Sequence, residues 1–398
     1  MTPEQLAILM MGILLVMVLG GVHLAFSLMF LGVIFGLIHR GTAIFPLFNL
    51  SIFGVMQNEI IIAVPLFIFM GCILERCGAA EKVYGTLHQL LGPMRGGLAA
   101  TTILICTVFA ACTGVIAASV TTMALIALPA MIKRGYDKGL AAGSVCAGGT
   151  LGILIPPSVM LVMYGPMANL SVAKLFAAAI FPGLILSAAY LAYIGVRCWR
   201  QREAGPPVSI EERTAVRGKL LSRTALYLLP TLFLIVAVLG SILGGVASPT
   251  EASGLGAFCA LLIAAGYRNL NLQNLKEAAY ETVKVTSMVL FVIVGAKMFT
   301  AVFLALRGGV LIANLLLGLP LGRWFILAVM MFIIFILGMV IDWIGILYII
   351  VPTFLPIAAT LGFDPLWFAL LICVNLQMSF LTPPFAYAIF FVKGVAPP

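Results

Sequence analysis

Charged side chains are scarce in this chain. Only 9% of its 398 residues are Asp, Glu, Lys or Arg, whereas 63% are apolar. A soluble protein carries about a quarter charged residues, so the composition excludes water-soluble domains and predicts an integral membrane protein. At about 20 residues per span, the length allows roughly ten to thirteen membrane-crossing or re-entrant segments.

The residues that mark several kinds of enzyme are also missing. The three histidines are scattered and form no H-E-x-x-H motif, so a metalloenzyme has no visible ligand set. No G-x-x-x-x-G-K-[ST] motif is present, which argues against ATP as the energy source. The eight cysteines lie mostly in apolar runs without metal-binding spacing. We therefore expect no catalytic residue and no cofactor. A membrane enzyme stays as a competing class, which would depend on one of the few polar residues.

Basic residues are concentrated in one place. The chain has 22 Lys and Arg against 13 Asp and Glu, and seven of the basic residues lie in a single polar segment. By the positive-inside rule, this segment is predicted to be a cytoplasmic loop. The seven residues are Arg197, Arg200, Arg202, Arg213, Arg217, Lys219 and Arg223.

The most informative feature is an ungapped internal repeat. Residues 128–157 align with residues 355–384 at a constant offset of 227, with nine identities that include Gly, Asp and both prolines of a Pro-Pro pair. The turn 133–138 is basic, whereas its counterpart 360–365 has no Lys or Arg. The first turn is therefore predicted to be cytoplasmic and the second external. Two oppositely oriented copies with broken helices indicate a secondary transporter that binds its substrate at the repeat interface.

The predicted fold is an all-α integral membrane protein with an inverted repeat, two re-entrant helical hairpins and two Pro-Pro broken helices. The hairpins are expected near 97–131 and 325–358, and the breaks at 148–157 and 375–384. Carbonyls and hydroxyls at such breaks suit Na⁺, while half-helix N-termini suit an anionic substrate. Breaks that only ease helix packing are the alternative interpretation.

Candidate binding residues come from these tips and breaks. The Na⁺ candidates are Thr113, Gly149, Thr150, Gly152, Gly338, Asp342, Gln377 and Thr382. The substrate candidates are Gly114, Ser119, Pro157, Ser158, Ser379 and Pro383.

Two charged residues lie within apolar runs, and one polar motif precedes an apolar helix. Asp342 is costly in a membrane unless it is paired or faces water, so it could bind a cation or carry a proton, or it could cap or fix the hairpin tip. Lys297 could attract an anion, form an ion pair or extend to the membrane surface. Ser248 and Glu251 are predicted to form a capping box at the start of a helix.

Characteristic motifs lie along almost the whole chain, at 65–71, 75–78, 127–137, 149–158, 248–252, Asp342 with Val351-Pro352, and 381–384. Together they closely resemble the large membrane subunit of the tripartite ATP-independent periplasmic (TRAP) transporters. The resemblance implies an elevator-type transporter with two Na⁺ sites and no further cofactor, in the bacterial inner membrane. It also implies a periplasmic substrate-binding protein and a separate small four-helix membrane subunit as partners.

Two departures from this family pattern are visible. The first hairpin tip reads Thr113-Gly114-Val115-Ile116, where the family often has Ser-Gly-Ser-Ser, so ion coordination there would depend mainly on carbonyls. Family members also continue past the segment at 393–397, so we expect the chain to be truncated at its C-terminus.

The expected domains alternate between scaffold and transport elements. They are scaffold helices in 1–96, the first hairpin and broken helix in 97–196, the basic loop in 197–224, scaffold helices in 225–324, and the second hairpin and broken helix in 325–398.

The predicted function is Na⁺-coupled, binding-protein-dependent uptake of an organic acid. Within the family, the stretch 381–385 and the Asp342-Trp343 pair favour a 2-oxo acid or another monocarboxylate. A stand-alone secondary anion transporter of inverted-repeat design is the alternative.

Overall fold

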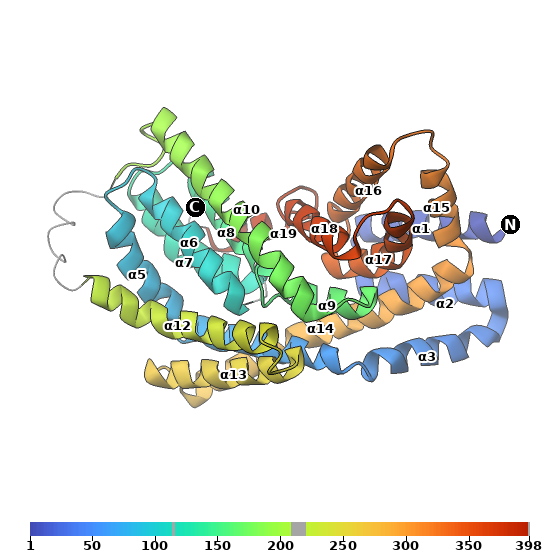
Figure 1. Cartoon of the computed structure of the whole chain (residues 1–398), viewed down its shortest axis with the longest axis horizontal. Helices are drawn as coiled ribbons and strands as arrows, with labels where there is room; N and C mark the ends of the chain where they lie inside the picture. The colour runs from blue at the N-terminus through green and yellow to red at the C-terminus, as the bar shows by residue number, and fades with distance from the viewer. Residues whose placement is uncertain (114–115, 208–219, 397–398) are drawn as a thin grey trace. The chain divides into compact units, whose positions relative to one another are not determined.

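The computed structural model describes residues 1–113, 116–207 and 220–396, and every regular element among them is a helix (Figure 1). The prediction of an all-α protein is therefore confirmed. The helices are α1 (Pro3–Leu19), α2 (Leu24–Arg40), η1 (Gly41–Ile44), α3 (Phe45–Met56), η2 (Glu59–Ile62), α4 (Ala63–Arg76), α5 (Ala79–Leu91), α6 (Gly97–Thr113), α7 (Ile116–Lys133), α8 (Lys138–Thr150), η3 (Leu151–Ile153), α9 (Val159–Ala168), α10 (Val172–Arg200), α12 (Leu220–Leu243), α13 (Pro249–Gly266), α14 (Leu272–Ala305), α15 (Gly308–Leu317), α16 (Arg323–Gly338), α17 (Trp343–Thr360), α18 (Pro365–Ser379) and α19 (Tyr387–Val395).

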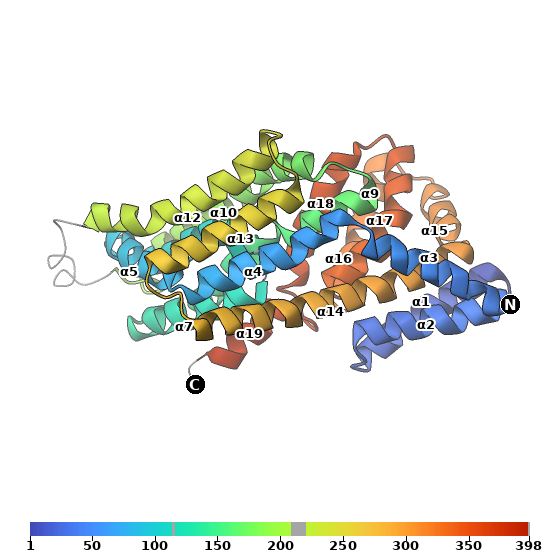
Figure 2. The ribbon, with the colours of Figure 1, turned by 90° about the horizontal axis from the view of Figure 1, so that it is seen from below.

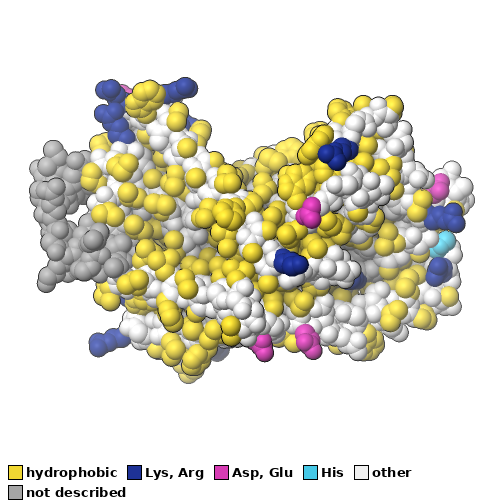
Figure 3. Space-filling view, in the orientation of Figure 1, with side chains coloured by type: hydrophobic (Ala, Val, Ile, Leu, Met, Phe, Trp, Pro, Cys, Tyr) yellow, Lys and Arg dark blue, Asp and Glu magenta, His cyan; other side chains and the backbone are white. Residues whose placement is uncertain are grey.

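Among the described residues, six helical segments are long and apolar enough to cross a membrane, or seven if the bent pair Glu59–Arg76 and Ala79–Leu91 counts as one span. Seven shorter apolar helices have 10–17 residues. The outward faces are apolar as well: on α10 and α12, Phe181 is 72% exposed and Phe233 68% exposed. Figure 3 shows apolar side chains over much of the visible face and few charged ones. Such faces are stable in contact with lipid, where charged groups are costly.

The chain forms two compact units. The first comprises Met1–Ile62, Met163–Ser171 and Lys284–Phe385. In this unit α16 packs against α17 and α18, and α15 packs against α17. The C-terminal part of α14 crosses α2 closely, because a Cβ added at Gly295 would lie 2.8 Å from the Ala25 carbonyl oxygen. The Thr300 hydroxyl donates to the Tyr348 carbonyl at 2.9 Å and joins α14 to α17.

The second unit comprises Ala63–Val162, Val172–Val283 and Ala386–Pro398. Here α6, α7 and α8 pack together, α19 packs on α7 and α8, and α4 lies along α13 (Figure 2). The α4–α13 contact is close at Gly256, where an added Cβ would lie 2.6 Å from Met70 Sδ. The Arg76 guanidinium at the end of α4 pairs with the Glu277 carboxylate of α14.

Polar side chains define where several helices begin. At α13 the Ser248 hydroxyl accepts from Glu251 N at 3.2 Å, and Glu251 Oε2 accepts from Ser248 N at 2.7 Å. The predicted capping box is therefore confirmed. At α6 the Tyr136 hydroxyl accepts from Leu98 N at 3.2 Å. Burial raises the pKa of the Tyr136 phenol, so this group stays neutral at physiological pH.

Candidate functional site

The helix boundaries follow the sequence repeat. α7 covers 116–133 and α17 covers 343–360, so both ends of the pair are separated by the offset of 227. The turns that follow have the same design. Asp137 Oδ1 accepts from Leu140 N at 2.8 Å, and Asp364 Oδ1 accepts from Trp367 N at 2.8 Å. The two copies therefore share the length of this helix and the caps of the next one, as well as sequence identities.

The first break lies between α8 and α9. α8 ends at Thr150, η3 follows, and α9 begins at Val159 after Pro156-Pro157. Proline has no N–H, so the carbonyls of residues 152 and 153 cannot accept from the amide four residues later. The Ser158 hydroxyl donates to the Ile153 carbonyl instead. The Thr150 hydroxyl donates to the Ala147 carbonyl at 2.9 Å.

The second break has the same prolines but a different cap. α18 ends at Ser379 and α19 begins at Tyr387, with Pro383-Pro384 between them. The carbonyls of residues 379 and 380 thus also lack an amide donor four residues later. The counterpart of Ser158 at the offset of 227 is Phe385, whose side chain has no donor. The Phe385 amide donates instead to the Met339 carbonyl at 3.0 Å, next to the end of α16.

The ends of α16 and α18 meet through Gly338 and Ser379. A Cβ added at Gly338 would lie 1.8 Å from Ser379 Oγ, so only glycine fits there without movement. In the first copy the corresponding residues are Ala111 and Gly152, since both pairs differ by 227. Ala111 there belongs to a buried cluster with Leu151 and Ile155, beside Gly152. The second copy therefore has its glycine at the end of the first helix of the pair (α16), whereas the first copy has its glycine after the second helix, in η3.

Three buried polar residues end α18, and they do not share one face. Asn375 Oδ1, Ser379 Oγ and both amide atoms of Gln377 have no hydrogen-bond partner among the described residues. Asn375 and Ser379 are four residues apart and share a face, on which Asn375 Nδ2 donates to the Met331 carbonyl of α16 at 2.7 Å. Gln377, two residues from each, points to another side of the helix. Asn375 was not among the candidates, although its i,i+4 spacing to Ser379 is visible in the sequence.

Asp342 is placed at the start of α17. It is the N-cap residue, and its Oδ2 accepts from Ile344 N at 3.4 Å. The structure thus shows the helix-capping role that was one of its alternatives. Within the described parts of the chain, no three His, Cys, Asp or Glu residues come together as metal ligands. Oxygen ligands near Asp342 would have to come from carbonyls, hydroxyls and amides.

The other candidates of the second copy are closer to the surface. The Thr382 hydroxyl donates to the Met378 carbonyl, so it caps the last turn of α18. Pro383 is exposed. Neither residue presents a buried oxygen without a partner.

The described candidates of the first copy are buried, and one of them lies at a close helix–helix contact. Gly149 allows α8 to approach α7, because an added Cβ would lie 2.2 Å from Val120 Cγ2. Ser119 beside it is 8% exposed. Gly152 is buried in η3, and Pro157 is buried as well. Thr113 ends α6, but its side chain and Gly114 lie outside the described residues.

Lys297 lies in α14 and shares a small cavity with Met163 and Pro166 of α9. Its Nζ lies 5.6 Å from the centre of the Tyr348 ring, in a cation–π geometry. Gly54, Asn58 and Met167 line the same small cavity of about 40 Å³. This volume is far below the range of about 300–1,000 Å³ for small-molecule sites, so the cavity in this conformation is too small for an organic anion.

A helical protein with apolar outer faces and two breaks in corresponding places belongs to the class of multi-pass membrane transporters. The family model of the tripartite ATP-independent periplasmic transporter, DctM component, matches residues 11–397. The chain therefore belongs to this family of transporter permeases.

Individual relatives agree with this assignment. The C4-dicarboxylate TRAP transporter large permease protein DctM of Pseudomonas aeruginosa is 33% identical over 87% of this chain and 80% of that protein. The isethionate TRAP transporter permease protein DctMQ of Oleidesulfovibrio alaskensis is 32% identical over 84% of this chain and 52% of that protein. The solved YdaH transporter of Alcanivorax borkumensis has a similar fold, with a TM-score of 0.57 at 16% identity over 85% of this chain and 78% of that chain.

Proposed function

We propose that this chain is the large permease subunit of a Na⁺-coupled transporter that imports a carboxylate by an elevator mechanism. The observation that carries the proposal is the pair of breaks after α8 and α18, where prolines deprive the preceding carbonyls of amide donors. Unwound carbonyls and half-helix ends are the ligands that secondary transporters use for Na⁺.

The side chains at the second break support an ion site. A buried polar atom without a partner in a native structure calls for an explanation such as a bound ion. Gln377 is 2% exposed and Ser379 4% exposed, and neither side chain has a partner among the described residues. The Gln377 amide oxygen, with carbonyls of the α18 end, would contribute to a Na⁺ site, whereas Ser379, on another side of α18, would face the substrate. Thr150 and the carbonyls around Gly149 and Gly152 would form the second one, with Thr113.

The substrate would interact with the half-helices that follow the prolines. Their N-termini carry partial positive charge, next to Ser158 in the first copy. The relatives' names specify a C4-dicarboxylate and isethionate, which are both organic anions. A carboxylate fits this pattern, and the Asp342-Trp343 pair is the basis for favouring a monocarboxylate.

Opposite insertion of the two copies is supported by the charges of their turns. Residues 133–138 include Lys133, Arg134 and Lys138, whereas 360–365 include no basic residue. With the first turn in the cytoplasm, the two copies would form an inverted repeat in the inner membrane. Import of two Na⁺ with one monoanion moves one net charge inward and gains about 2.3 kcal/mol per 100 mV.

The proposed partners are a separate small four-helix membrane subunit and a periplasmic substrate-binding protein. The isethionate relative is almost twice as long as the part of it that this chain matches. Both partners are proposed because the chain belongs to the family of TRAP transporter large permeases.

The test is uptake into proteoliposomes that contain this chain and its small subunit. Radiolabelled carboxylate should accumulate only when an inward Na⁺ gradient and the loaded binding protein are both present. Equal uptake with K⁺ in place of Na⁺ would refute the coupling. Equal uptake without the binding protein would instead favour the stand-alone anion transporter.

A further inference from the structure

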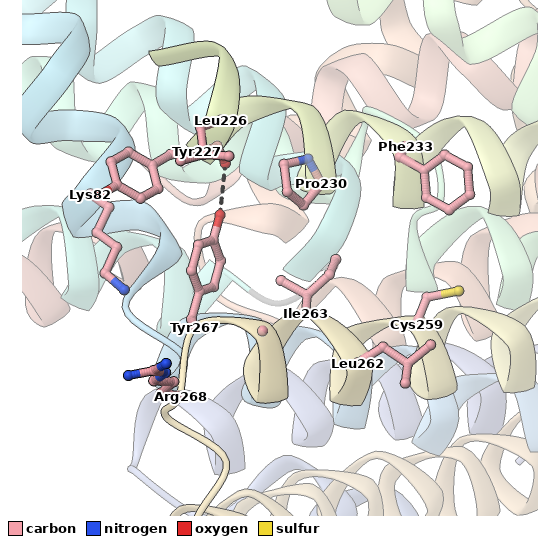
Figure 4. Close-up of a pocket in the computed structure, with 11 residues that line it drawn as sticks. Lys82, Leu226, Tyr227, Pro230, Phe233, Cys259, Leu262, Ile263, Tyr267 and Arg268 are labelled. Carbon is pink, nitrogen blue, oxygen red and sulfur yellow. Dashed lines mark hydrogen bonds between the residues drawn. The ribbon is translucent and has the colours of Figure 1, made fainter. Parts of the chain in front are cut away.

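A cavity in the second unit lies outside both breaks. Its volume is about 550 Å³, and it lies between α12 and α13 (Figure 4). The volume is within the range of small-molecule sites. Its walls are formed by Leu226, Pro230 and Phe233 of α12, together with Cys259, Leu262 and Ile263 of α13.

One end of this cavity is cationic. Lys82 of α5 and Arg268, which follows α13, line the end opposite Phe233 and Cys259 (Figure 4). Lys82 Nζ lies 4.5 Å from the centre of the Tyr267 ring. Neither Lys82 nor Arg268 forms an ion pair with an acidic residue in the part of the chain that the structure describes. Their charges are therefore available to an anion.

A tyrosine pair stabilises this end. The Tyr267 hydroxyl donates to the Tyr227 carbonyl at 3.0 Å and so joins the end of α13 to the start of α12. Tyrosine rings are typical of the level where a membrane meets water. The cationic end therefore lies where lipid headgroups lie, and the apolar walls extend toward the membrane interior.

The side of the membrane follows from the chain direction. The cationic end is near the start of α12, which begins within the basic segment 197–224 that is predicted to be cytoplasmic. From Leu226 to Phe233 the cavity follows seven residues of α12, or about 10 Å at 1.5 Å per residue. The cavity thus has a cationic end at the membrane surface and apolar walls below it. A phospholipid in the inner leaflet has the matching arrangement, with its anionic headgroup at the surface and its acyl chains below.

We propose that this cavity binds an anionic phospholipid of the cytoplasmic leaflet. Lys82 and Arg268 hold its phosphate, and an acyl chain lies against Pro230, Phe233 and Leu262. Basic pockets between transmembrane helices on the cytoplasmic side recognise such headgroups. A helix of a partner protein fits less well: helices are 10–12 Å wide with a 5.4 Å pitch, so the cavity holds about one helical turn.

The charge test compares two double variants by native mass spectrometry of the purified chain with added phosphatidylglycerol or phosphatidylcholine. The wild type should retain phosphatidylglycerol in preference. Lys82→Gln with Arg268→Gln should weaken this binding about thirtyfold, a roughly fivefold loss for each charge. The control, Lys138→Gln with Arg202→Gln, removes the same charge from exposed positions and should change binding less than twofold.

A second variant tests the cavity without changing its charge. Gly266 lines the cavity, and a Cβ added there would meet no atom within 4 Å. Gly266→Phe should therefore fill the space, displace phosphatidylglycerol, and abolish the rise in unfolding temperature that this lipid gives the wild type.

Three results would overturn the proposal. The first is equal retention of phosphatidylcholine and phosphatidylglycerol by the wild type. The second is unchanged phosphatidylglycerol binding by Lys82→Gln with Arg268→Gln, which decides the matter even where Gly266→Phe does not fold. The third is a Gly266→Phe chain that keeps its lipid but no longer co-purifies with the small subunit, which would make the cavity a protein interface.

Discussion

Gly338 and Ser379 are in such close contact that a methyl group added at Gly338 would lie only 1.8 Å from Ser379 Oγ. The contact joins the ends of α16 and α18, where the second break begins. The first copy has Ala111 and Gly152 in the same places, with the small residue exchanged. The two pairs therefore suggest a compensating substitution.

Gly338→Ala should destabilise the protein by about 1–3 kcal/mol, because it overpacks a filled interface. Adding Ser379→Gly should restore most of the lost stability, since the double variant has the Ala/Gly arrangement of the first copy. The measurement is the unfolding temperature in detergent without Na⁺. Gly12→Ala in α1 is the matched control, because its added Cβ would meet no atom within 4 Å. No recovery in the double variant would show that the two pairs are not equivalent.

Gln377→Leu should weaken the Na⁺ dependence of transport without lowering the stability of the protein. The buried Gln377 amide has no partner among the described residues, and such a group costs about 1–3 kcal/mol. In Na⁺-free buffer the leucine variant should unfold at the same or a higher temperature than the wild type. In proteoliposomes its Na⁺ stimulation of uptake should fall at least tenfold.

The exposed Gln57→Leu at the end of α3 serves as its control and should change neither quantity. A Gln377→Leu protein that is more stable and keeps full Na⁺ dependence would remove Gln377 from the ion site.

The repeat also supplies its own control for helix capping. Asp137→Ala and Asp364→Ala each remove an N-cap, which should cost about 1 kcal/mol. Asp137 additionally pairs with Arg197 at 3.0 Å, but exposed ion pairs contribute only about 0–1 kcal/mol. The two alanine variants should therefore lose similar stability, measured by thermal unfolding, and Asn at either position should preserve most of it. A much larger loss for Asp137→Ala would assign the main role to the ion pair.

Local signals in the sequence predicted much of the helical organisation. The capping box at Ser248 and Glu251 depends on residues three apart, so it can be recognised without knowledge of the fold. The prolines at 156–157 and 383–384 remove backbone donors whatever surrounds them. These features depend on covalent structure and near neighbours, which the sequence contains directly.

Contacts between distant segments could not be predicted in the same way. Gly338 was proposed as an ion ligand because it lies near a hairpin tip, whereas the structure shows that its lack of a side chain admits Ser379, 41 residues later. The Asn375 bond to the Met331 carbonyl is equally non-local. Which face of α18 meets α16 is decided by packing, and apolar residues all round the helix leave no periodic signal to reveal it.

The constant offset of 227 has a consequence for how this gene could have diverged. Of 30 aligned positions in the repeat, 21 differ, yet the alignment contains no gap. Each residue added to a helix turns everything beyond it by about 100° and shifts it by 1.5 Å. Insertions within 116–157 or 343–384 would thus rotate a whole break away from its neighbours, whereas substitutions change one contact at a time. Spacing, more than side-chain chemistry, is what the two aligned segments have in common.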